Sequence, residues 1–154
     1  MRTTRFLLLF AVLAPAFAPI PAEASPEGLT AAMSAEEASP MPGPVGAKGT
    51  MTMDADGATG KVCYQLTYEG PGEMTGAHIH RGEKGITGPV TINLDVKAEC
   101  IETAPTAVEA LLEWPDGYYV EVHTLLYQVK NGAVRGQVAF SDGRPSVKPP
   151  NRID

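Results

Sequence analysis

The sequence is poor in cysteine, aromatic residues and basic charge, and it lacks the short motifs that mark many enzymes. Its 154 residues include two cysteines, 6% aromatic residues, and 12 Lys and Arg against 18 Asp and Glu, for a net charge of −6. The shortage of clustered basic residues argues against binding to nucleic acid or to anionic lipid. The chain also has no Gly-x-Ser-x-Gly elbow, phosphate-binding loop or dinucleotide fingerprint. Nothing in the sequence therefore demands an enzyme, and whether the chain is one stays open.

Long apolar runs are also missing. The run over residues 6–14 is too short to cross a bilayer core of about 30 Å. Two arginines precede this run, and Ala22-Glu23-Ala24 follows it. Such a pattern is typical of a cleaved leader. We therefore predict a signal peptide over residues 1–24, a mature chain from Ser25 without a membrane span, and a secreted or periplasmic location.

The rest of the chain divides by composition into a domain and two flanks. Residues 25–47 are rich in Ala, Pro, Ser, Glu and Gly, and such segments bury too little apolar surface to offset their ordering entropy. We predict a flexible linker there and a flexible C-terminal tail over residues 142–154, which is rich in proline. One folded domain is then expected over residues 48–141.

Cys63 and Cys100 are the two cysteines. An even number of cysteines in an exported chain favours a disulfide. By the loop-entropy estimate, closing this loop would stabilise the fold by about 4 kcal/mol. The alternative is a pair of buried free thiols.

Most of the predicted domain is typical of β-strands separated by turn residues. One helix is expected after a capping box at Thr106–Glu109, ending at Pro115. Short strands at regular spacing favour an all-β, antiparallel sandwich or barrel. The predicted strands cover residues 50–54, 61–68, 74–80, 89–94, 118–124 and 133–140.

The three histidines, His78, His80 and His123, all fall on predicted strands. Alternate residues of a strand point to the same face, so His78 and His80 project together, and Glu121 shares a face with His123. If the two strands are neighbours, the three imidazoles can converge. Three neutral imidazoles suit one copper or zinc ion with a fourth position left for water. Glu121 can then fix an imidazole tautomer.

Other interpretations of these residues stay open. The histidines can be structural, hydrogen-bonded to the backbone or to Glu121, or they can lie on a solvent-exposed face. Arg135, on another predicted strand, can support the cluster by pairing with Glu121 or with a backbone carbonyl.

Four segments in this order resemble the chordin-type (CHRD) domain family: Gly76–Gly82, Gly88–Val90, Tyr118–Thr124 and Gly132–Gln137. The resemblance covers residues 48–141. It implies an immunoglobulin-like β-sandwich, an extracytoplasmic setting, and a binding role rather than catalysis. One departure is Glu121, which stands where the family often has asparagine.

The His78-Ile79-His80 strand is also similar, more weakly, to the copper-ligand strand of copper/zinc superoxide dismutases, although three histidines are too few for their bridged two-metal site. Three hypotheses follow. The domain binds one copper or zinc ion; or it binds an extracellular protein or matrix partner and its histidines are structural; or it is a small copper redox enzyme.

Overall fold

A computed structural model describes residues 25–128 and 132–150 of the chain. The predicted signal peptide lies outside the described residues. The elements are β1 (Glu27–Ser34), β2 (Lys48–Asp56), β3 (Lys61–Glu69), β4 (Met74–Arg81), β5 (Val90–Leu94), β6 (Cys100–Glu102), α1 (Pro105–Glu113), a 3-10 turn (Pro115–Gly117), β7 (Tyr118–Thr124) and β8 (Val134–Phe140).

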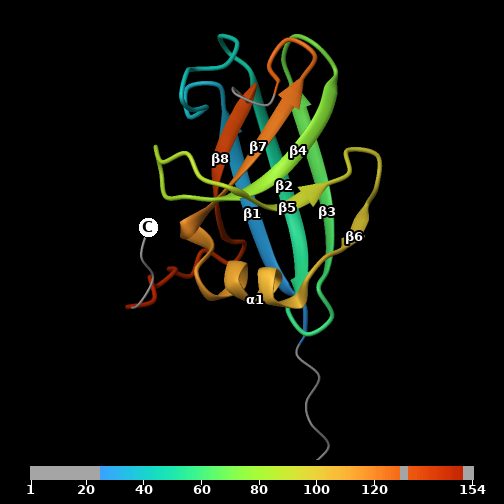
Figure 1. Ribbon diagram of the computed structural model, residues 1–154, viewed down its shortest axis with the longest axis vertical. Helices are drawn as coiled ribbons and strands as arrows, with labels where there is room; N and C mark the ends of the chain where they lie inside the picture. Colours follow the sequence, from blue (N-terminus) through green and yellow to red (C-terminus); the bar gives the residue numbers. More distant parts are fainter. Residues whose placement is uncertain (1–24, 129–131, 151–154) are drawn as a thin grey trace, which may run out of the picture.

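The strands form one antiparallel sheet in the order β5-β4-β7-β8-β1-β2-β3-β6. The sheet curls so that its two halves lie across from each other, with α1 at one end (Figure 1). The apolar core lies between the halves, and it unites Met51, Met53 and Val62 from one half with Ile79 and Val120 from the other. The predicted all-β, antiparallel fold with one short helix is confirmed.

Strand β2 shows how the sequence specifies one face of this sheet. Its residues alternate between exposed and buried, with Met51 and Met53 inside and Thr50 and Thr52 outside. A period of two is what a strand requires when one of its faces packs on a core.

Strand β1 corrects the prediction of a linker over residues 25–47. Residues 27–34 pair with β2 on one side and with β8 on the other, and they bury Leu29, Ala31 and Met33. The expected linker is therefore wrong for this segment, which lies near the middle of the sheet. The flexibility of the C-terminal tail stays a prediction, although Arg144 in the described part of that tail forms an ion pair with Glu27.

Helix α1 closes the end of the core with Val108 and Leu111, which are fully buried. It begins at Pro105 after Ala104, and no side chain caps its first turn. The predicted capping box at Thr106 is therefore wrong. Proline has no N–H at this first helical position, so one fewer donor needs a partner there. The helix can therefore begin without a side-chain cap.

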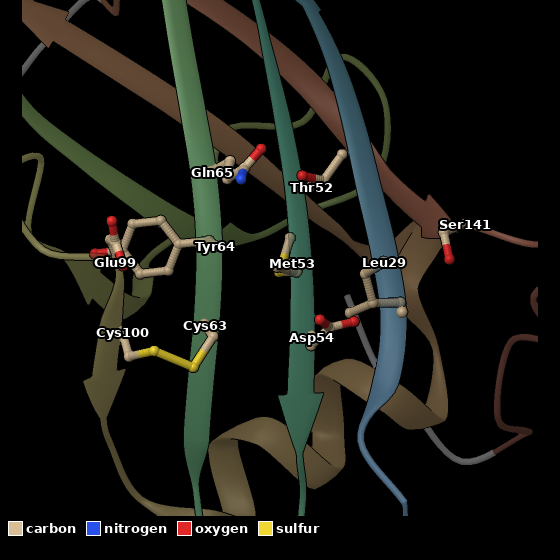
Figure 2. A pocket seen from close by; sticks show the side chains of 11 residues that line it. Leu29, Thr52, Met53, Asp54, Cys63, Tyr64, Gln65, Glu99, Cys100 and Ser141 are labelled. Atoms are coloured by element: carbon tan, nitrogen blue, oxygen red, sulfur yellow. A yellow bond between two sulfur atoms is a disulfide. The ribbon is translucent and has the colours of Figure 1, made fainter.

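The sulfur atoms of Cys63 and Cys100 lie 2.12 Å apart, as the expected disulfide requires. The two residues face each other in the register of β3 and β6, and Figure 2 shows the bond joining these strands. The disulfide therefore ties the three-residue edge strand β6 to the sheet.

Candidate metal centre

Strand β7 carries the candidate site because it is buried along its whole length. Val120 and Val122 belong to the core, so the alternate residues Tyr119, Glu121 and His123 must lie on the opposite face. That face is covered by neighbouring chain rather than by solvent, since Glu121 and His123 are only 6% and 5% exposed. The β7 strand thus presents buried polar side chains on the face away from the core.

Strand β4 is the neighbour of β7, as convergence of the histidines requires. In the antiparallel register His78 is opposite Glu121, and Gly76 is opposite His123. Glycine at that point places no side chain beside the His123 imidazole. The histidines of both strands therefore lie on the same covered face.

The three imidazoles converge. One candidate ligand atom from each of His78, His80 and His123 lies within 4.8 Å of the others. Ligand atoms that share one tetrahedral zinc ion lie about 3.4 Å apart, so small side-chain rotations would bring all three into range. Moreover, His78 Nδ1, His80 Nε2 and His123 Nδ1 are buried without a hydrogen-bond partner. Buried polar atoms without partners are rare, and here three of them lie in one cluster, which fits a bound cation.

His80 is held in a defined orientation. Its Nδ1 lies 3.0 Å from the carbonyl oxygen of Gly88, and only a protonated Nδ1 can donate to that acceptor. Its ring also stacks on Tyr119, with centroids 4.8 Å apart and planes 10° from parallel. In the neutral ring, Nε2 therefore carries the lone pair.

Arg135 supports this stack from the next strand. Its guanidinium carbon lies 3.5 Å from the centre of the Tyr119 ring, a cation–π contact. Its Nη2 donates to the carbonyl oxygens of Glu83 and Ile86, at 2.8 and 3.0 Å. The sequence left Glu121 or a backbone carbonyl as the partner of Arg135, and these hydrogen bonds are to backbone carbonyls. Arg135 thus anchors the loop over residues 82–89 above the site.

A second loop, over residues 35–47, contacts the loop over residues 82–89. Its Glu37 pairs with Lys84 at 2.7 Å, and its Ser39 hydroxyl lies 3.1 Å from that of Thr87. Neither loop could be connected with the site from the sequence. Residues 35–47 and 82–89 show no strand or helix periodicity, and their contacts depend on distant strands.

Burial sets the protonation of the cluster. Burial lowers the pKa of His123 to about 4, and burial is also the largest cause that lowers the pKa of His78 and of His80. For Glu121, burial is the largest cause and raises the carboxyl pKa. At neutral pH the imidazoles are therefore uncharged, which is the form that binds metal ions.

We expect the metal-free protein to lose stability as the pH falls from 6.5, the ordinary pKa of His123, toward about 4. In this window the unfolded chain binds a proton at His123 that the folded chain does not, so acid favours unfolding. Urea denaturation across this range would measure the slope. His123→Gln should show a weaker dependence, and equal slopes in both proteins would contradict the prediction. Because Glu121 contributes with the opposite sign, the comparison between the two proteins isolates His123.

Another hollow lies away from the histidines. A pocket of about 450 Å³ crosses the outer surface of β1, β2 and β3 beside the disulfide, with Asp54, Tyr64 and Glu99 on its walls (Figure 2). None of its lining residues belongs to the histidine cluster. It is open, with a lining that mixes polar and apolar residues and no feature that selects a ligand.

The fold and the site together define a small antiparallel β-domain with a buried cluster of imidazoles. The CHRD domain family matches residues 29–138 of the chain. The chain belongs to the CHRD domain family, as the four sequence segments predicted. The match begins within β1, which moves the start of the domain from residue 48 to the first strand.

No curated protein and no solved structure significantly matches the chain. The similarity to copper/zinc superoxide dismutases therefore stays a prediction. Among residues 25–128 and 132–150, no helix has the length and apolar character needed to cross a membrane.

Proposed function

We propose that this CHRD domain is exported and binds a single copper or zinc ion through His78, His80 and His123. The observation that supports the proposal is the group of three buried imidazole nitrogens without hydrogen-bond partners. All three belong to residues whose candidate ligand atoms lie within 4.8 Å of one another. If the histidines served only to stabilise the fold, these buried nitrogens would be expected to form hydrogen bonds within the protein.

The site has the features of a preformed metal centre. His80 is oriented by Gly88 and Tyr119, which is how a metal-ligating histidine is usually fixed from its far side. The disulfide and the family both fit a location outside the cytoplasm. The chain that begins at Ser25 is therefore the form to test.

Elemental analysis and titration with copper or zinc test the proposal directly. We expect one ion per chain with submicromolar affinity in the wild type. His78→Ala/His80→Ala should lose this binding while staying folded by circular dichroism. A wild type that binds no ion would refute the proposed function.

A protein-binding module with structural histidines is the second candidate. It is favoured by Leu125 and Leu126, which directly follow β7 and are 66% and 70% exposed. Large exposed apolar side chains that are contiguous can mark an interaction surface. If this candidate is right, Leu125→Ser/Leu126→Ser removes partner binding, and the wild type binds no metal ion.

A further inference from the structure

Glu121 lies beside the histidines but does not hydrogen-bond to them, so orienting their rings does not explain its place. Its Oε2 atom lies 3.6 Å from Nε2 of His80 and 3.6 Å from Nε2 of His123. Both distances are too long for a hydrogen bond. The carboxylate therefore does not hold an imidazole tautomer in the way that the sequence suggested.

The tautomer of His80 sharpens this point. Because Nδ1 of His80 donates its proton to the Gly88 carbonyl, Nε2 of the neutral ring has only a lone pair to offer. That lone pair faces a carboxylate oxygen across 3.6 Å in a buried space. Two electron-rich atoms in such a setting repel each other unless a proton or a metal ion lies between them, and the 3.6 Å separation is too long for a proton shared in a hydrogen bond. The separation is close to the roughly 3.4 Å between two ligands on one tetrahedral ion.

The chain also holds the Glu121 carboxylate in place. The backbone of Gly132 forms a hydrogen bond with it. A Cβ atom at position 132 would lie 2.3 Å from Cγ and 2.6 Å from Oε1 of Glu121, so only glycine lets the backbone approach this closely. With the carboxylate fixed by Gly132, its Oε2 atom is directed at Nε2 of His80 and Nε2 of His123, so an ion shared with Glu121 would be bound by Nε2 of His123 rather than by its Nδ1.

We propose that Glu121 is the fourth ligand of the metal ion, so that the site has three imidazoles and one carboxylate. The proposal rests on the proposed metal-binding function. It replaces the water expected from the sequence with a protein ligand, and four protein ligands are typical of closed zinc sites that hold the ion. A carboxylate is a hard ligand and favours divalent ions over the softer Cu(I). The occupant is therefore a divalent ion that is retained rather than presented to a substrate.

Glu121→Gln tests this assignment, because it removes the charge and keeps the shape. The affinities of the wild type and variant for Zn²⁺ and for Cu(I) would be measured by competition with chelators. We expect the Zn²⁺ affinity to fall by more than the roughly 10–100-fold typical of a residue that only supports a ligand, and the Cu(I) affinity to change far less. The control is Glu69→Gln, on an exposed glutamate paired with Lys48, which should bind like the wild type.

A measurement on the wild type makes the test independent of the variant's folding. The cobalt-loaded wild type should keep its visible spectrum when azide is added, because no coordination position is open. If azide binds to the wild-type ion, or if Glu121→Gln binds Zn²⁺ as tightly as the wild type, Glu121 is not a ligand and the three-histidine site stands without it. If the wild type binds no metal ion at all, the proposed function fails as well.

Discussion

Loading the protein with Zn²⁺ at about 1,000 times its dissociation constant should raise the free energy of unfolding by about 4 kcal/mol. The reason is that folding brings His123 on β7 next to His78 and His80 on β4. In the unfolded chain, His123 is separated from the other two by more than forty residues. Both cysteines are joined to each other, so the unfolded oxidised chain offers no thiolate to compete for the ion.

Urea denaturation with and without Zn²⁺ would measure this gain. His78→Ala/His80→Ala should show none, and its midpoint in urea should be the same with and without the ion. Equal stabilisation of the wild type and this variant would mean that the ion binds elsewhere, and would contradict the three-histidine site.

Replacing both cysteines, as Cys63→Ser/Cys100→Ser, should lower the free energy of unfolding by about 4 kcal/mol. The disulfide closes a loop across a sequence separation of 37, and this loop contains β4, β5 and both histidines of the His78–His80 pair. Without the bond, the unfolded chain gains conformational freedom, and β6 is retained only by its short pairing with β3.

The same variant also separates stability from function. Cys63 and Cys100 lie on β3 and β6, whereas the histidines lie on β4 and β7 in the other half of the sheet. We therefore expect the folded variant to bind Zn²⁺ with nearly the affinity of the wild type. An unchanged urea midpoint would contradict the predicted role of the bond.

The sequence predicted the candidate site better than it predicted the limits of the domain. The alternation of side chains along a strand is a local property. His78 and His80 could therefore be placed on one face of their strand, and Glu121 and His123 on one face of theirs, without knowing the fold. That β4 and β7 are neighbours was only a condition of the hypothesis. The pairing depends on the whole sheet, and the structure supplies it.

The central strand β1 could not be recognised from its composition. Its inward residues include the small Ala31 beside Leu29 and Met33, and this gives a weaker apolar signal than the strands with valine and isoleucine. Its stability comes from β2 and β8 on either side, and neither partner is visible in the local sequence. In the same way, the contact between Gly88 and His80 depends on a loop that no periodicity describes.

The place of β1 between β2 and β8 has a consequence for the order in which the domain assembles. Leu29 pairs with Phe140, so the first and last strands are neighbours at the centre of the sheet. Contacts between residues far apart in sequence slow folding, because the chain must close a long loop before they form. The sheet can be completed only after β8 has emerged from the ribosome. During synthesis the chain is therefore without its native fold, a state that is compatible with the export proposed above.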